Sequence, residues 1–87
     1  MERVVAKNTS EILIWVASVF EASADKIRPE TKKEEIDAWD SLGILTLIAR
    51  MDEDFQVLLS EEEIQQLRSV GDIIEILRKH GHAEDRP

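Results

Sequence analysis

Apolar residues recur at helical spacing between residues 8 and 22. They are Ile12, Leu13, Trp15, Val16, Val19 and Phe20. Counted from Ile12, most of them fall at i, i+4, i+7 and i+8, the spacing of one buried helix face, which leaves Ile14 on a flank. Asn8, Thr9 and Ser10 are the candidate N-caps, and Glu11 falls in the first turn. The pattern predicts a first helix here; residues 1–7 carry no cap or strong pattern, so they either extend it by a turn or fray.

The pattern then breaks between residues 23 and 40. Pro29 disfavours helix at the preceding residue, and the stretch from Thr31 to Glu35 is charged and lacks helical apolar spacing. A loop of this length in a small domain is more often functional or anchored than structureless. Its isolated apolar residues are the expected anchors: Ile27, Ile36 and Trp39. We therefore predict a long ordered loop.

A second helix is predicted from Ser41 to about residue 54, with Asp40 as its N-cap. Its apolar positions are Leu42, Leu45, Ile48 and Met51 along one side, with Ile44, Leu47 and Phe55 beside them. This stripe is wider than one core contact requires. It indicates deep burial between other helices, a face left open for a ligand or partner, or both.

Two further helices complete the pattern. Ser60 and Glu63 form a capping-box sequence that opens a short third helix, held by Ile64 and Leu67. Ser69 is the expected cap of a fourth helix, whose apolar positions are Val70, Ile73, Ile74 and Leu77 and whose end is marked by Gly81. The prediction is an all-α, small four-helix bundle with a long loop between helices 1 and 2 and a short third helix. It is one domain over residues 1–87, with an ordered core of about residues 9–81 and a frayed tail at 82–87.

Composition narrows the function classes. The 87 residues carry 19 acidic and 11 basic side chains, a net charge of −8, which repels nucleic acid and suits partners with basic surfaces. The chain has no cysteine, and therefore no disulfide or thiolate zinc site. No apolar run reaches the roughly 18 residues of a membrane span, and the first residues lack a signal-peptide core. We expect a cytoplasmic monomer that neither binds nucleic acid nor inserts into membranes.

Ser41 is the candidate for chemistry. As the first residue of a helix capped by Asp40, its hydroxyl is predicted to lie exposed at the positive end of the helix dipole, where a phosphodiester is favoured by about 0.3–1 kcal/mol. His80 and His82 lie at a distant helix end, so no base is expected to activate this serine, and two imidazoles make a poor metal site. We predict a chain that is neither an enzyme nor a metal protein.

A calcium loop is the rival hypothesis for the end of the second helix. The twelve-residue template started at Asp52 places Asp54 at position 3 and Glu63 at position 12. Position 6, which needs glycine for a sharp turn, is Val57. Phe55, Val57, Leu58 and Leu59 fit better as buried connector residues. A non-covalent helical adaptor, with a calcium-sensitive variant, therefore stays as the alternative function.

Several of these features together resemble the acyl carrier proteins. They are Asp40-Ser41-Leu42 opening the second helix, the long loop before it, Phe55 ending it, the capped short third helix and Ser69-Val70-Gly71-Asp72 opening the fourth. The resemblance covers about residues 11–81. It implies that Ser41 receives 4′-phosphopantetheine from coenzyme A through a separate phosphopantetheinyl transferase, and that the chain then carries acyl groups as thioesters for acyl-loading and acyl-processing enzymes.

The resemblance also implies roles for neighbouring residues. Leu42 flanks the attachment serine and contributes to recognition, and Leu42, Met51, Asp52 and Glu53 dock against basic patches on partners. The chain departs from fatty-acid carriers, which usually have acidic residues soon after the serine, because Gly43, Ile44, Leu45 and Thr46 intervene here and Arg50 adds a positive charge. It also lacks the glycine-rich approach to the serine that is typical of peptidyl carriers. We therefore predict a free-standing carrier of a specialised pathway, such as polyketide or hybrid assembly.

Overall fold

The computed structural model describes residues 7–83, and this part of the chain is helical throughout its regular structure. The elements are α1 (Thr9–Val19), the 3₁₀ turns η1 (Ala24–Lys26) and η2 (Lys33–Glu35), α2 (Ser41–Phe55), α3 (Glu61–Gln66) and α4 (Val70–Lys79). Between residues 7 and 83 the β-type pairing consists of two isolated bridges, Lys7 with Ala83 and Lys32 with Ser69. The predicted all-α fold of four helices with a long first loop is confirmed.

The helices begin where capping residues were expected. The Asn8 side chain accepts a hydrogen bond from the Glu11 N–H at 2.9 Å, and the Glu11 carboxylate accepts one from the Asn8 N–H at 3.0 Å. Ser60 and Glu63 make the same reciprocal pair at the start of α3. Before α4, the Asp72 carboxylate accepts hydrogen bonds from the N–H groups of Arg68 and Ser69. These bonds satisfy backbone donors that lack a partner within a helix.

The helix ends are less regular than their starts. The first helix ends at Val19, three residues before the predicted end, because Glu21 adopts a left-handed conformation (φ 53°) and the Ala22 N–H reaches back to the Ala17 carbonyl. Gln56 (φ 57°) ends α2 in the same manner, with the Val57 N–H donating to the Met51 carbonyl. Glycine usually takes this position, so neither end could be located from composition.

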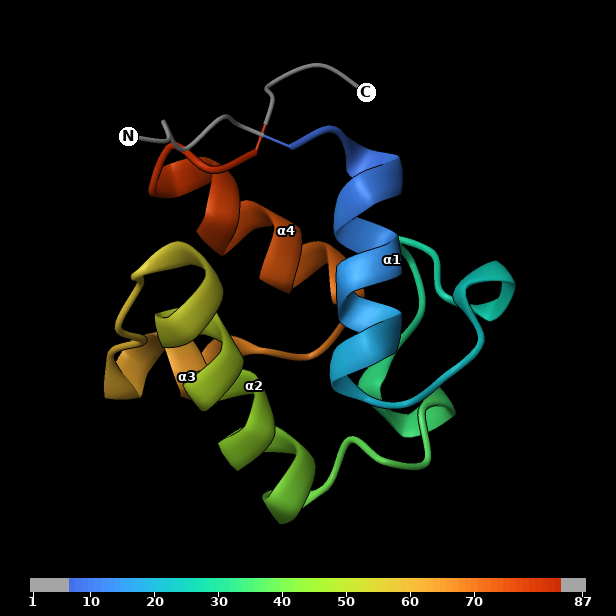
Figure 1. Ribbon diagram of the computed structural model, residues 1–87. Coiled ribbons are helices and arrows are strands. Elements are labelled where there is room, and N and C mark those ends of the chain that lie inside the picture. The colour runs from blue at the N-terminus through green and yellow to red at the C-terminus, as the bar shows by residue number, and fades with distance from the viewer. Residues whose placement is uncertain (1–6, 84–87) are drawn as a thin grey trace.

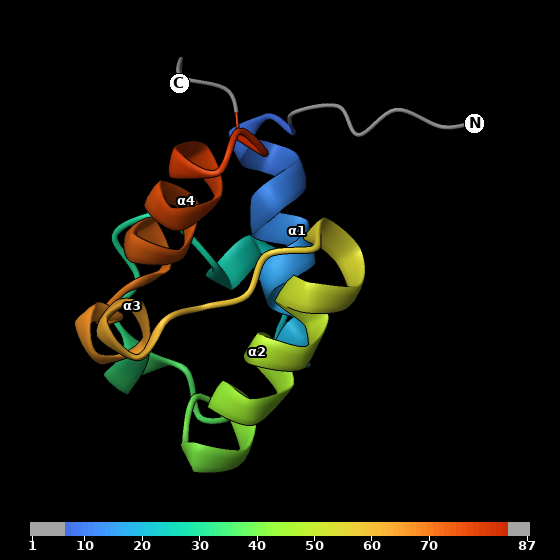
Figure 2. The same ribbon diagram turned by 90° about the vertical axis from the view of Figure 1, so that its left-hand side faces the viewer.

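The core lies where α1 packs against α2 and α4 (Figure 1). Its buried helical side chains include Ile12, Trp15, Val16, Val19, Phe20, Leu47, Met51, Phe55, Val70, Ile73, Ile74, Ile76 and Leu77. As predicted, Ile27, Ile36 and Trp39 are buried and anchor the long loop, while Ile14 on α1 is exposed. Figure 2 shows the connection after α2 running across to α3; Val57 at the start of this connection and Leu67 directly after α3 are both buried in the core.

Two expectations about buried and frayed segments are wrong. Leu58 was expected in the core, but it is 75% exposed, because neighbouring residues in an extended connector point to opposite sides and Val57 takes the buried side. The tail was expected to fray from His82. Instead, the His82 carbonyl accepts a hydrogen bond from the Lys7 N–H at 3.0 Å, the His82 ring contacts Phe55, and Ala83 is buried. The expectations for residues 1–6 and 84–87 lie outside the described residues.

Within the described part of the chain, no helix combines the length and the apolar character that crossing a bilayer requires.

Candidate functional site

The site begins with the cap of α2. The Asp40 carboxylate Oδ1 accepts a hydrogen bond from the Gly43 N–H at 2.9 Å, and the Asp40 carbonyl accepts one from the Ile44 N–H at 2.8 Å. Asp40 itself is extended (φ −123°, ψ −164°), as an N-cap residue should be. The predicted cap is present, and it makes Ser41 the first residue of the helix.

Ser41 is exposed at this helix start. Its hydroxyl makes no hydrogen bond to the residues between 7 and 83, in contrast to Thr46 one turn on, whose hydroxyl donates to the Leu42 carbonyl at 3.1 Å. The first turn of α2 contains no acidic side chain. An anion attached to Ser41 would therefore meet the positive end of the helix dipole without a neighbouring carboxylate inside that turn.

Asp40→Ala is expected to lower the free energy of unfolding by about 0.5–2 kcal/mol, because the Gly43 N–H loses its acceptor. Thermal unfolding measures the loss. Asp37→Ala is the matched control, since it removes the same charge from an exposed position that has no capping bond. Equal stability of the two variants would refute a stabilising role for the cap.

The loop before Ser41 is held from two sides. Trp39 is buried and its ring stacks on Phe20 of α1, with centroids 4.9 Å apart and planes 15° from parallel. Gly43 then brings α2 against the loop so closely that a Cβ built on it would lie 1.9 Å from the Ala38 carbonyl oxygen. These contacts fix residues 38–40 and, with them, the direction in which α2 starts.

The same loop is hydrogen-bonded to the start of α4. The N–H groups of Gly71 and Val70 donate to the carbonyls of Pro29 and Thr31 at 2.7 and 2.9 Å, respectively. The Lys33 N–H donates to the Arg68 carbonyl at 2.9 Å. The loop is therefore a rigid part of the fold, as the sequence predicted, but the sequence did not identify α4 as its support.

A groove adjoins Ser41 between η2, the start of α2 and α3. Its apolar lining is Trp39, Ile44, Ile64 and Leu67, and its polar lining is Lys33, Glu34, Asp40, Ser41 and Gln65. A second hollow shares Asp40 but not Ser41, and runs between the end of α1 and α2 beside Phe20, Glu21 and Thr46. Ser41 thus opens onto one of two neighbouring hollows.

The exposed side of α2 forms a single stripe. Leu42, Leu45, Ala49, Asp52 and Glu53 are all exposed and fall at i, i+3, i+7, i+10 and i+11, which places them on one helix face. Leu42 is 72% and Leu45 62% exposed. The wide apolar pattern therefore divides into a side buried in the core and a side exposed on the surface.

Met51 does not belong to this exposed stripe. It is fully buried, so the expectation that it docks with partners is wrong. Met51 follows Leu42 by nine residues, or about 2.5 turns at 3.6 residues per turn, which puts the two side chains on opposite faces. Met51 shares its buried face with Leu47 and Phe55, four residues before and after it.

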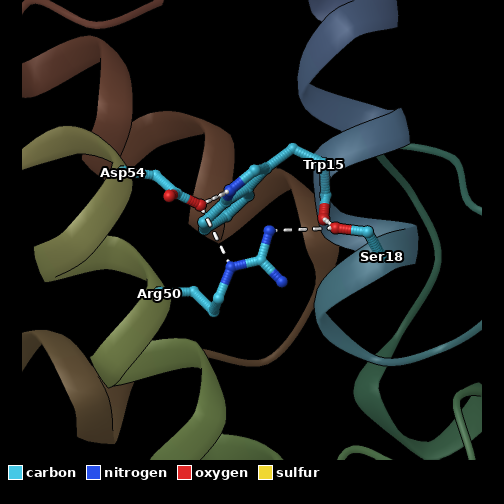
Figure 3. A network of polar contacts seen from close by, with 4 residues as sticks. All are labelled: Trp15, Ser18, Arg50 and Asp54. Atoms are coloured by element: carbon cyan, nitrogen blue, oxygen red, sulfur yellow. Dashed lines mark hydrogen bonds and ion pairs between the residues drawn. The ribbon is translucent and has the colours of Figure 1, made fainter.

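Asp54 lies in a polar network that links α2 to α1 (Figure 3). Trp15 Nε1 donates to Asp54 Oδ2 at 2.7 Å, and Arg50 Nε donates to the same oxygen at 3.0 Å. Arg50 also donates to the Ser18 hydroxyl oxygen at 3.2 Å and lies over the Trp15 ring. The sequence indicated Asp54 as a position of the calcium template, but this residue is engaged within the fold, while Asp52 and Glu53 face solvent.

The hydrogen bond from Trp15, together with the Arg50 guanidinium, holds the pKa of Asp54 below its ordinary value, although partial burial opposes this. Because this pKa is lower in the folded state than in the unfolded state, the Asp54 carboxylate stabilises the fold at pH values above the unfolded pKa of 3.8. This stabilisation is lost as the pH falls through the folded pKa. Asp54→Asn is therefore expected to destabilise the protein near neutral pH and to cost much less in acid.

Thermal unfolding of the parent and Asp54→Asn at about pH 7 and about pH 3 tests this expectation. Glu53→Gln, at the exposed neighbouring position, is the control and should match the parent at both pH values. A stability gap for Asp54→Asn that does not change with pH would contradict the assigned cause.

Two of the three acidic groups of the calcium template, Asp54 and Glu63, have other partners within the fold. Asp54 binds Trp15 and Arg50, and Glu63 accepts the Ser60 N–H while lying 3.4 Å from His80 Nε2. Phe55 and Val57, inside the template, are buried. Across residues 7–83, no three His, Asp or Glu side chains are arranged to hold a metal ion.

Comparison with known proteins gives one consistent result. No protein-family model matches the chain. It is 33% identical over 75 residues to the acyl carrier protein of Solidesulfovibrio magneticus, covering 86% of this chain and 92% of that protein. It is 40% identical over 47 residues to the acyl carrier protein of Chlamydia trachomatis, covering 54% and 60% of the two chains. Among solved structures, the holo acyl carrier protein of Geobacter metallireducens superposes with a TM-score of 0.66 at 28% identity, covering 91% of this chain and 98% of that one.

Proposed function

Since this chain belongs to the acyl carrier protein family, we propose that it carries acyl intermediates as thioesters on a 4′-phosphopantetheine arm attached to Ser41. The family is one of carriers and not of catalysts, so the chain serves as the substrate of a phosphopantetheinyl transferase. The observation that carries the assignment to Ser41 is its place as the exposed first residue of α2, capped by Asp40 and opening onto a groove.

The residues around Ser41 fit the arm. Its hydroxyl is not engaged by another described residue, so attachment breaks no hydrogen bond of the fold. A phosphodiester there meets the N-terminal end of a fifteen-residue helix whose first turn has no acidic residue. The groove beside it offers apolar side chains and the Gln65 amide. Acyl groups bound to the thiol of the arm travel with the carrier between enzymes.

Attachment needs chemistry that the partner must supply. The Ser41 oxygen forms the new bond to phosphorus as the phosphoanhydride bond of coenzyme A breaks; adenosine 3′,5′-bisphosphate leaves, and a base must take up the hydroxyl proton. No basic side chain within residues 7–83 is hydrogen-bonded to Ser41, so we infer that the transferase supplies this base. The Mg²⁺ also belongs to the transferase reaction, as the family resemblance implies.

The exposed stripe of α2 is the surface that we propose for docking. Its apolar end, Leu42 and Leu45, lies next to Ser41, and its acidic end, Asp52 and Glu53, lies about 16 Å along the axis at 1.5 Å per residue. A partner that is complementary to this stripe presents an apolar contact at the mouth of its active site and basic side chains about 16 Å away from it. Leu42 keeps its proposed role in recognition beside the serine, while Met51 has none in docking.

This division of the stripe supports the specialised-pathway proposal. The positions after Ser41 are Gly43, Ile44, Leu45 and Thr46, so a partner that relies on acidic residues there finds apolar contacts instead. We place the function in the cytoplasm, in polyketide, hybrid or fatty-acid-like assembly. The adaptor hypothesis has less support, because two of the three carboxylates of its calcium template, those of Asp54 and Glu63, have other partners in the fold.

Intact-mass measurement tests the proposal. The chain is incubated with coenzyme A, Mg²⁺ and a broad-specificity phosphopantetheinyl transferase, with omission of each component as a control. We expect the mass to rise by one phosphopantetheinyl group only in the complete mixture. If a panel of active transferases leaves the mass of the folded chain unchanged, the carrier proposal fails and the adaptor hypothesis takes its place.

A further inference from the structure

Lys33 is a basic residue placed at the groove onto which Ser41 opens. Its backbone N–H donates to the Arg68 carbonyl at 2.9 Å, and Lys33 is one of the residues that line the groove together with Ser41. No carboxylate within residues 7–83 forms an ion pair with its ammonium group, although the chain has a net charge of −8. The fold thus presents an unpaired cation on the groove of the proposed attachment site.

We propose that Lys33 binds the phosphodiester of the arm on Ser41 and directs the arm into this groove, so that Lys33 is a positioning residue of the carrier. The inference rests on the proposed function. It adds that one of the two hollows next to α2 receives the arm, and that a residue outside α2 selects it.

Charge distinguishes the two hollows. The lining of the groove between η2 and α3 includes one basic residue, Lys33, besides the acidic residues Glu34 and Asp40. The second hollow is lined by Glu21 and Asp40 and by no basic side chain. A phosphodiester keeps its negative charge at all physiological pH values, so it is attracted toward Lys33 and repelled from the second hollow.

The groove beyond the phosphate also suits the rest of the arm. Ile44, Ile64 and Leu67 provide apolar surface for the geminal methyl groups of pantetheine. The Gln65 side chain provides both a donor and an acceptor for the amide groups of the arm. The positive charge of Lys33 and the mixed apolar and polar lining of the groove therefore both favour placement of the arm in this groove.

The test uses the loaded protein, with loading confirmed by mass. In the parent, we expect nuclear Overhauser contacts from the geminal methyl groups of the arm to the side chains of Ile44 and Ile64. Lys33→Met should weaken these contacts by at least about half and shift the ³¹P resonance of the phosphodiester. Salt at about 1 M should have the same two effects on the parent, because it shortens the Debye length to about 3 Å. Lys32→Met is the matched control, since it removes the same charge from the neighbouring exposed residue, which does not line the groove.

The outcomes separate this inference from the function on which it rests. Absence of any mass gain contradicts the attachment itself. Loading followed by contacts from the arm to Phe20 and Thr46 places the arm in the second hollow. This result overturns the role of Lys33 but leaves the attachment to Ser41 intact. Contacts and a ³¹P resonance that are the same in Lys33→Met, Lys32→Met and the parent overturn it as well.

Discussion

Ser41→Ala is expected to abolish loading by a phosphopantetheinyl transferase completely while leaving the fold intact. The hydroxyl is the only group that the substitution removes, and it makes no hydrogen bond to the described residues, so the free energy of unfolding should change by no more than about 0.5 kcal/mol. Intact mass reports the loading, and thermal unfolding of the same samples reports the stability.

Thr46→Ala is the control for this substitution. Thr46 carries the nearest other hydroxyl group on α2, and this hydroxyl already donates a hydrogen bond to the Leu42 carbonyl at 3.1 Å. This variant should load as fully as the parent. Loading of Ser41→Ala would show that Ser41 is not the acceptor. Loss of helical structure in this variant would show that the Ser41 hydroxyl is not the free surface group that its surroundings indicate.

Gly43→Ala is expected to destabilise the protein by about 2 kcal/mol. An added Cβ would lie 1.9 Å from the Ala38 carbonyl oxygen and 3.3 Å from a ring carbon of Phe20, so the loop and α2 must separate. Overpacking of this kind costs about 1–3 kcal/mol, and occasionally more. The better helix propensity of alanine returns about 1 kcal/mol at most. Chemical denaturation with two-state analysis measures the difference.

Gly71→Ala is the matched comparison for Gly43→Ala. Gly71 also lies in the first turn of a helix and also faces a carbonyl of the long loop, but its Cβ would lie 3.0 Å from the Pro29 oxygen, so a small shift suffices. We expect a smaller loss of stability than for Gly43→Ala. A stabilised Gly43→Ala variant would mean that the loop before Ser41 yields easily and does not position the serine.

The sequence predicted the parts of this fold that depend on local chemistry. Asp40 and Ser60 were identified as caps, and Asn8 was one of three candidates, because a cap is a bond between residues two or three apart. The anchors Ile27, Ile36 and Trp39 were identified because an isolated apolar residue in a charged loop has few alternatives to burial. The position of Ser41 at the start of a helix follows from the same local signals.

The errors concern contacts between residues distant in the chain. Asp54 was considered as a position of the calcium template, and nothing nearby in the sequence indicated its bond to Trp15, 39 residues earlier. The sequence also did not indicate that the Ala38 carbonyl approaches Gly43 so closely. His82 seemed to begin a frayed tail because its partners, Lys7 and Phe55, lie in other parts of the chain.

The candidate site was predicted less completely than the fold. The proposed acceptor, Ser41, and its cap came from the order of residues along one helix, and the role of Leu42 came from the family resemblance. Met51 was misplaced, because a series of residues three apart drifts around a helix of 3.6 residues per turn and reaches the opposite face after three steps. The groove beside Ser41 could not be predicted, since η2, α2 and α3 each contribute to it.

Mapping the arm to a single residue tests the central claim most directly. Trypsin cleaves after Lys33 and Arg50 and releases a peptide of residues 34–50, in which the hydroxyl side chains are Ser41 and Thr46. Fragmentation of this peptide from the loaded chain is expected to place the phosphopantetheinyl mass on Ser41. An unmodified 34–50 peptide from a chain that has gained the mass, or an arm on Thr46, would contradict the account.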